Sequence, residues 1–385
     1  MSAARVPSVD LSSVIRPGDG LVWGQACAEP QTLVEALIAQ RAALSGCSVF
    51  LGSSYSGLLR PAHADHLRLS SYCGTGSNRA LAEAGVLEIL PAPYSQLGAL
   101  LRGGQIKCDV VMLQVSLPNA RGEYSLGLGV EYLAPALEVA RTVIAEVNEQ
   151  VPWTYTEPLL RRDDFDLAVQ TSRAPVYLEY GKAGDLEQRI AANAAQCVPE
   201  GATVECGIGA LPNAILAELA GRQFDYHSGV ICEAVRTLGA KRCLGGALMG
   251  TQALFDWARE NPAVQLTSSE VTHGAATLAK IERFVAINSA VEVDFTGQVN
   301  GEIARGSYVG AVGGALDFVR AANQSPGGLS ITALSASRVV ERLSGPVSVP
   351  RSEASIIVTE HGAADLRGCT LAERERRLRK ISGNS

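Results

Sequence analysis

The chain has 385 residues, of which 47% are hydrophobic and 19% are charged, and its formal net charge is −6 at pH 7. This apolar fraction is sufficient for folded cores and excludes a chain that is disordered throughout. The sequence has no Lys/Arg cluster of the kind that binds nucleic acid and no run of about 18 apolar residues that could span a membrane. We therefore expect a folded protein of two or three domains without nucleic-acid or membrane partners.

The first half of the chain alternates buried strands with helices. The expected strands cover residues 47–54, 65–72, 108–116 and 141–148, and the expected helices cover residues 30–44, 78–85, 94–103 and 131–140. Strands that alternate with helices indicate mainly parallel sheets covered on both faces.

The second half repeats this alternation after residues 166–180, which we expect to be a connector. A clear helix is expected at residues 186–197, and further helices at 212–220, 251–260, 314–323 and 370–380. Strands are expected at residues 202–208, 284–295, 329–334 and 354–360. We place the domain boundary near residue 182, which gives α/β domains at residues 1–182 and 183–385.

An internal similarity favours two related domains. Residues 20–37 (GLVWGQACAEPQTLVEAL) and 201–219 (GATVECGIGALPNAILAEL) both read as a glycine, a short apolar strand, a turn of small residues, a proline and a helix. Pro30 and Pro212 fall where the first helical turn tolerates proline. The two copies are explained by two domains that open with the same β-turn-α unit, or by chance similarity of two ordinary turns.

The nine cysteines form no C-x-x-C pair, and several lie in apolar strand-like runs. We expect reduced, buried thiols in a cytoplasmic protein and no structural zinc or other metal site.

Two glycine turns precede expected helices. Gly207 and Gly209 follow a strand and open one helix, and Gly313 and Gly314 precede another. Backbone N–H groups in such turns can bind an anion or supply an oxyanion donor, although tight turns also need glycine for steric reasons. The glycine spacing does not match a dinucleotide-binding fingerprint.

Polar residues interrupt apolar strands at their carboxyl ends, namely Gln114 and Ser116 in one strand and Asn288 in another. Ligands of open α/β sheets bind beyond these ends, and a capping hydrogen bond is the alternative explanation for each residue.

Glu270 and His273 lie in the polar loop LTSSEVTHG, His227 and Glu233 lie in YHSGVICEAV, and His361 lies beside Gly362. A solvated loop residue is the simpler interpretation of each. The sequence has no G-x-S-x-G, H-E-x-x-H or Walker motif.

Several ordered segments together resemble the acetyl-CoA hydrolase/CoA-transferase family, which includes 4-hydroxybutyrate and succinyl-CoA:acetate CoA-transferases. The matching segments are AEPQTLVEAL (28–37), QVSLPNARGEYSLG (114–127), TVIAEVNEQVP (142–152), GIGALPNAIL (207–216), ALMGTQALFD (247–256), AINSAVEVDFTGQVN (286–300), VGGALDFVRAA (312–322) and VTEHGAADLRG (358–368). The resemblance implies two similar α/β domains with the active site in the cleft between them.

The resemblance also implies covalent catalysis in which a glutamate attacks an acyl-CoA thioester and then carries CoA. It assigns contact with the thioester region to Gly313 and Gly314, and it places His273 nearest to an active-site asparagine of the family. The family's nucleophilic glutamate follows a His-Ser/Thr pair, but this chain reads His227-Ser228-Gly229. The usual glutamate is therefore replaced by Gly229.

Three hypotheses remain for the reaction. A different glutamate acts as nucleophile of a CoA-transferase, with Glu270 favoured over Glu233. Alternatively, a carboxylate or histidine activates water and the chain is an acyl-CoA hydrolase. Finally, the chain binds CoA esters as a catalytically altered paralogue or subunit. On the first hypothesis, which we favour, Glu270→Ala abolishes turnover and Glu233→Ala is tolerated.

The expected substrates are an acyl-CoA and a small carboxylic acid, with no cofactor beyond CoA itself. We also expect a homo-oligomer, dimeric or larger. The candidate catalytic residues are Glu270, Glu233 and His273. The candidate CoA- or substrate-binding residues are Gly207, Gly209, Gly313, Gly314, Gln114, Ser116, Gly229, Asn288 and Gly362.

Overall fold

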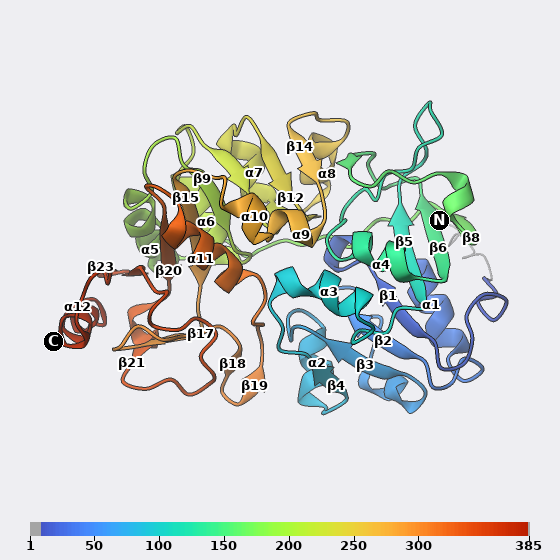
Figure 1. Cartoon of the computed structure of the whole chain (residues 1–385), viewed down its shortest axis with the longest axis horizontal. Helices are drawn as coiled ribbons and strands as arrows, with labels where there is room; N and C mark the ends of the chain where they lie inside the picture. Colours follow the sequence, from blue (N-terminus) through green and yellow to red (C-terminus); the bar gives the residue numbers. More distant parts are fainter. Residues whose placement is uncertain (1–8, 384–385) are drawn as a thin grey trace. The chain divides into compact units, whose positions relative to one another are not determined.

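The computed structural model describes residues 9–383, which form two compact units (Figure 1). The first unit runs to Leu90 and also contains Gln96–Leu178 and Gly246–Glu270. The second contains Pro91–Ser95, Glu179–Gly245 and the residues from Val271 onward. The chain therefore enters the second unit briefly at Pro91–Ser95, enters it again after Leu178, returns to the first at Gly246, and ends in the second.

The first unit is built on a parallel sheet with the strand order β4-β3-β2-β1-β5-β6-β8. Its strands are β1 (Gly20–Trp23), β2 (Ser48–Leu51), β3 (Arg68–Ser71), β4 (Leu87–Ile89), β5 (Val110–Val115), β6 (Thr142–Asn148) and β8 (Leu167–Thr171), with β7 (Tyr155–Thr156), β13 (Ala247–Met249) and β14 (Val264–Leu266) outside this order. Its helices are α1 (Gln31–Gln40), α2 (Asn78–Glu83), α3 (Leu97–Arg102), α4 (Leu133–Val139) and α8 (Gln252–Ala258).

Apolar side chains cover both faces of this sheet, as its continuous hydrophobic strands predict. On one face, Leu33 and Leu37 of α1 pack with Leu21, Val49 and Met112. On the other face, the Phe50 ring meets the ring of buried Tyr132, which precedes α4, edge to face.

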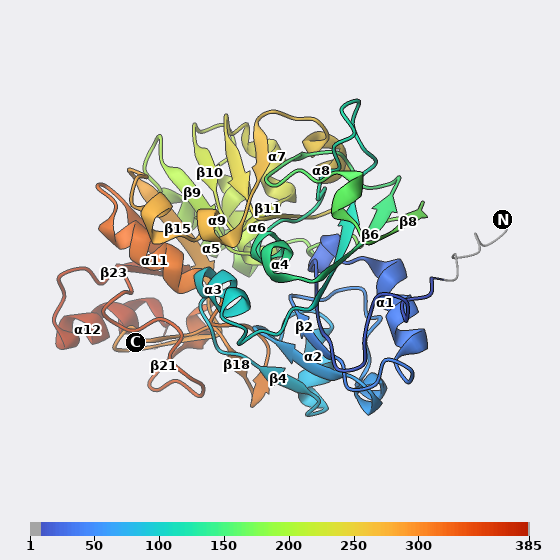
Figure 2. The ribbon, with the colours of Figure 1, turned by 45° about the vertical axis from the view of Figure 1, so that its right-hand side comes forward.

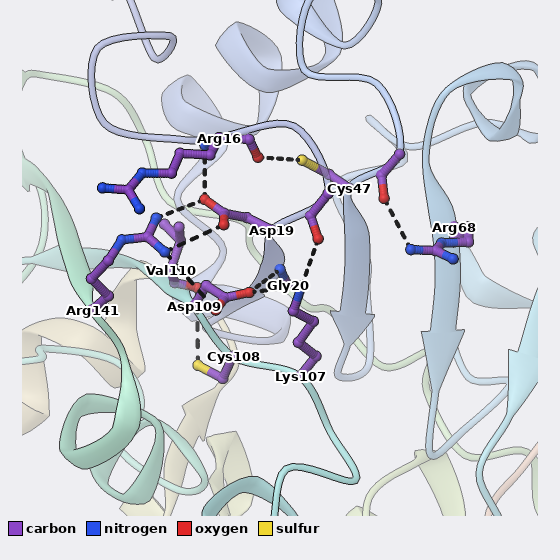
Figure 3. A network of polar contacts seen from close by, with 12 residues as sticks. Arg16, Asp19, Gly20, Cys47, Arg68, Lys107, Cys108, Asp109, Val110 and Arg141 are labelled. Carbon is purple, nitrogen blue, oxygen red and sulfur yellow. Dashed lines mark hydrogen bonds and ion pairs between the residues drawn. The ribbon is translucent and has the colours of Figure 1, made fainter.

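An ion pair and hydrogen bonds from backbone N–H groups to carboxylates hold the amino ends of the strands in the first unit (Figure 3). Asp19 accepts hydrogen bonds from the Arg16 backbone N–H and from Arg141 Nη2, both at 2.8 Å. Asp109 accepts a bond from the Gly20 N–H at the start of β1. These charges lie at the edge of the sheet opposite to the carboxyl ends of the strands, so they serve to align β1, β5 and β6.

The second unit has the strand order β23-β22-β20-β15-β9-β10-β12, which is parallel except for the edge pair β22–β23 in the pairings described. These strands are β9 (Thr203–Cys206), β10 (Asp225–His227), β12 (Cys243–Gly245), β15 (Phe284–Ser289), β20 (Leu329–Ala333), β22 (Ile356–Thr359) and β23 (Gly362–Asp365). Shorter strands are β11 (Val230–Cys232), β16 (Glu292–Asp294), β17 (Val299–Asn300), β18 (Ile303–Ala304), β19 (Ser307–Tyr308) and β21 (Val339–Val340).

Helices cover both faces of the second sheet (Figure 2). One face packs against α10 (Ala275–Leu278) and α11 (Ala315–Gln324), where Leu278 and Phe318 contact Phe284 and Ala286 of β15. The opposite face carries α5 (Asp185–Gln196) and α6 (Ala210–Glu218). The remaining helices are α7 (Glu233–Leu238), α12 (Leu371–Ile381) and the short α9 (Ser269–Thr272), whose residues are divided between the two units.

The α/β architecture with mainly parallel sheets is confirmed, and three local predictions are wrong. Residues 166–180 contain strand β8, which adds to the edge of the first sheet beside β6. The expected strand at 284–295 is divided into β15 and β16, which pair in different sheets. The loop around Glu270 contains the helical turn α9. In each case tertiary pairing or packing decided the local structure.

Both copies of the internal similarity form a parallel strand followed by a helix, as β1–α1 and β9–α6. All nine cysteines are free and seven of them are buried, as expected for structural thiols. Within residues 9–383, no helix is both long and apolar enough to cross a bilayer.

Candidate functional site

The candidate site lies at the carboxyl ends of β15, β9 and β10 in the second unit. These three parallel strands are adjacent, so the residues that follow them meet at one edge of the sheet. Gly207 follows β9, Gly229 follows β10, and Asn288 lies near the end of β15. The structure thus brings together three residues selected from the sequence.

The strand register places a carboxyl group beside an imidazole on one face of this sheet. Ala286 of β15 pairs with Glu205 of β9. Tyr226 of β10 pairs with Val204, so the next pair in this register joins His227 to Glu205. Register partners on parallel strands project from the same face. Glu205 and His227 therefore face α10 and α11, on the side where Phe284 lies edge to face against the His227 ring.

Glycines occupy the next positions on this face, two residues further along each strand. At Gly207, a Cβ atom would lie 3.1 Å from Asn288 Oδ1, so the Asn288 amide fills the space above this glycine. Asn288 Nδ2 donates a hydrogen bond of 2.9 Å to Glu205 Oε2. The amide therefore lies over Gly207 and contacts the carboxyl group of Glu205.

The imidazole of His273 fills the corresponding space above Gly229. A Cβ atom at Gly229 would lie 3.0 Å from His273 Cε1 and 3.2 Å from Nε2. On its other side the ring lies against Gly314, where a Cβ atom would overlap Nε2 and Cδ2. The ring also packs against Tyr94 and Phe318, with centroid distances of 4.8 Å and 4.4 Å. His273 is thus held between two glycines and two aromatic rings.

Both histidines are neutral at neutral pH. His273 Nδ1 shares a hydrogen bond with Thr272 Oγ1, and His227 Nε2 donates to the Thr272 carbonyl, because a carbonyl can only accept. Burial, with a smaller repulsion from His227, lowers the pKa of His273 to about 3. Burial also lowers the pKa of His227. Desolvation disfavours the imidazolium form in both cases.

Residues 91–95, which belong to the second unit, hold the turn at Gly313 and Gly314 in place through hydrogen bonds. The Tyr94 N–H donates to the Gly313 carbonyl at 2.9 Å. The carboxylate of Asp317, in the first turn of α11, accepts bonds from the Ser95 N–H and Oγ. Burial raises the pKa of Asp317. Gly313 has φ +55°, a conformation that glycine adopts without strain.

Two other candidate glycines have positive φ angles. Gly209 has φ +124° and directly precedes α6, near Gly207. Gly362 has φ +123° and opens β23, which is separated from β15 by β20 and β22. The structure therefore places Gly209 beside the cluster of Glu205, His227, Asn288 and His273, and it places Gly362 at the far edge of the sheet.

Gln114 and Ser116 lie in the first unit and have partners within it. Gln114 donates to the Cys27 carbonyl at 3.0 Å and accepts from Asn148 Nδ2 at 3.1 Å. Ser116 Oγ donates to the Leu117 carbonyl and accepts the Ser125 N–H. Both side chains are buried, and these bonds fix the end of β5.

The two glutamates selected from the sequence are in ion pairs with arginines. Both carboxylate oxygens of Glu270 accept hydrogen bonds from Arg102, at 2.6 and 2.9 Å, and Arg102 also binds Glu138. Glu233 begins α7 and pairs with Arg236 at 3.1 Å. All of these side chains are partly exposed.

Sequence reasoning missed Glu205, although its signal was present. The residue is 2% exposed and lies one position before the end of β9. Burial raises its pKa to about 8, against the opposing effect of hydrogen bonds from Asn288 and the Ile287 backbone. A charged residue inside an apolar strand, two positions before a glycine turn, has the same pattern that selected Gln114 and Asn288.

The chain is similar to known proteins along nearly its whole length. The family model described as the acetyl-CoA hydrolase/transferase N-terminal domain matches residues 7–158, and the corresponding C-terminal domain model matches residues 250–384. The 4-hydroxybutyrate coenzyme A transferase of Clostridium kluyveri is 31% identical over 94% of this chain and 90% of that protein. The butyryl-CoA:acetate CoA-transferase of Anaerostipes caccae is 29% identical over 96% of this chain and 91% of that protein. The crystal structure of RipA from Yersinia pestis superposes with a TM-score of 0.91 at 28% identity, over 96% of this chain and 92% of that one.

The buried carboxyl group of Glu205 predicts a characteristic pH dependence of stability. Between the ordinary value of 4.5 and about 8, folded Glu205 keeps a proton that the unfolded chain has released. The folded state then binds more protons, so this group lowers the unfolding free energy by roughly 1.4 kcal/mol per pH unit as pH rises through this window. Glu205→Gln removes the dependence. Urea denaturation from pH 5 to 8 should show that the variant gains stability relative to the original protein as pH rises. The same dependence of the unfolding free energy on pH in both proteins would contradict the raised pKa of Glu205.

Because His273 lies between two glycines, we expect the effects of substitutions at Gly314 and at His273 on stability to depend on each other. Gly314→Ala should destabilise the protein by about 1–3 kcal/mol, because the new methyl group overlaps the imidazole. Gly181→Ala is the matched control, since nothing lies within 4 Å of a Cβ atom there. The double variant with His273→Ala should lose less stability than the sum of the single variants in thermal unfolding. Strict additivity would show that the ring does not occupy this space.

Proposed function

Because the chain belongs to the acetyl-CoA hydrolase/transferase family, we propose that it transfers CoA between an acyl-CoA and a small carboxylic acid. The observation that carries this proposal is the similarity to a 4-hydroxybutyrate CoA transferase over nearly the full length of both chains. Residues from both units take part in this similarity.

The geometry of the second unit supports binding of the thioester end of CoA. The ten-residue helix α11 begins directly after Gly314, and a helix N-terminus favours negative charge. An oxyanion and a thiolate both develop when a thioester is attacked. The bonds from Tyr94 and Ser95 fix the glycine turn and the first turn of this helix, so that its N–H groups are held in place before the substrate binds.

The protonation states favour exchange between carboxylates over hydrolysis by a histidine base. Exchange of CoA between two carboxylates consumes no net proton, whereas hydrolysis requires a base that activates water. A general base works best when its pKa is near the working pH. His273, with a pKa of about 3, is too weak a base for that role at neutral pH.

The proposal is tested by following label between carboxylates. Purified protein is mixed with butyryl-CoA, succinyl-CoA or 4-hydroxybutyryl-CoA and with isotope-labelled acetate, and labelled acetyl-CoA is measured. We expect labelled acetyl-CoA with at least one donor, and a thiol reagent should detect no free CoA when acetate is left out. Free CoA at the same rate with and without acetate would show hydrolysis instead. No product in either assay would contradict both enzymatic functions.

A further inference from the structure

We propose that Glu205 is the carboxylate that attacks the acyl-CoA thioester and carries CoA in this chain. The inference rests on the proposed function, which it deepens by naming the reacting group. Gly229 supplies no side chain for this chemistry, so covalent transfer by this chain requires a carboxylate from another position.

Glu205 lies where a ligand of the second sheet is expected to bind. Its side chain projects from the central strand β9 at the sheet edge where ligands of parallel α/β sheets bind. It lies on the face that also carries His227, Asn288 and the start of α11. The strand register therefore places the carboxyl group of Glu205 in this cluster.

Glycine leaves the carboxyl group of Glu205 uncovered by its own strand. The next residue on the same face of β9 is Gly207, so no side chain of its own strand covers the carboxyl group. The group is covered instead by the amide of Asn288, which is only partly buried. A movement of this one side chain opens the carboxyl group toward the glycine turns, whereas a side chain at position 207 would block it.

The other candidate carboxylates are less suited to nucleophilic attack. Both oxygens of Glu270 are bound by Arg102, which withdraws electron density from the carboxylate. Glu233 is paired with Arg236 and is partly exposed to water. Among residues 9–383, no arginine or lysine is bonded to Glu205, and a desolvated carboxylate is the more basic and more reactive nucleophile.

The chemistry balances with a single carboxylate. An oxygen of ionised Glu205 adds to the thioester carbon, the C–S bond breaks, and CoA leaves as thiolate while an acyl–Glu205 anhydride forms. The thiolate then attacks the Glu205 carbonyl carbon, the acyl group leaves as its carboxylate, and Glu205 holds CoA as a thioester. An acceptor carboxylate reverses these two steps, and no proton is gained or lost overall.

The ionisation of Glu205 should set the pH dependence of the first step. The titratable groups around it are His227 on β10, His273 at the end of α9, Asp317 on α11, and Cys206 and Tyr226 on the neighbouring strand positions. Burial lowers the pKa of both histidines and raises the pKa of Cys206 and Tyr226 well above their usual values. The raised pKa of Glu205, about 8, then predicts that transfer becomes faster as pH rises from 6 to 8.

The test combines trapping with substitution. The protein is incubated with the donor acyl-CoA that is active in the labelled-acetate assay and is then reduced with borohydride, which converts a glutamyl–CoA thioester to an alcohol. Peptide mapping should find this change at Glu205. Glu205→Gln should lose the trapped product and lower the rate of transfer by roughly 10³-fold or more, while the protein remains folded. Glu146→Gln is the matched control, because Glu146 is also a buried glutamate on a parallel strand, and it should retain transfer.

The outcomes separate the two proposals. Reduction at Glu270 or Glu233, or normal transfer by Glu205→Gln, would overturn the assignment of Glu205 and leave the transferase function in place. Transfer by the original protein without any reduced glutamate would overturn the covalent role of Glu205 as well. Absence of both transfer and trapping with every donor would overturn the proposed function and, with it, this inference.

Discussion

The absence of side chains at Gly207, Gly229 and Gly314 is the constraint on which the candidate site depends. Each of these positions lies where a side chain would occupy the carboxyl edge of the second sheet or the start of α11. The space that they leave is filled by the Asn288 amide and the His273 ring. Because protein interiors are close-packed, a methyl group at these positions would displace the polar groups that define the site.

This packing also determines the charge state of the site. His273, His227 and Glu205 are all removed from water, and burial penalises the charged form of each group. The result is a neutral cluster at neutral pH, with the ionisation of Glu205 delayed to higher pH. Salt bridges occur elsewhere in the second unit, at partly exposed pairs such as Glu233–Arg236. Low polarity and a latent carboxylate are suited to carboxylate attack on a thioester, because desolvation makes the ionised carboxylate more reactive.

The family relationship and the local geometry bear on different questions. Similarity along both units identifies the family, and the relatives in it are named as CoA-transferases or as an acetyl-CoA hydrolase. It does not identify the group that performs the reaction here, because the residue after His227 and Ser228 is a glycine. The register between β9 and β10 puts Glu205 and His227 at neighbouring positions on one face of the second sheet, and our proposal of Glu205 starts from this placement.

The sequence by itself determined the α/β class, most of the strands and helices, and the glycines and amide that form the site edge. These features follow from local rules, because hydrophobic periodicity, glycine turns and polar strand ends are visible along the chain. Strand β8 was missed because its pairing with β6 supplies a stability that its own residues do not reveal. Only the tertiary structure showed that Glu205 lies beside His227, that His273 fills the space above Gly229, and that Arg102 binds Glu270. These are contacts between residues distant in sequence, and they are set by strand register and packing, which one sequence read along its length does not display.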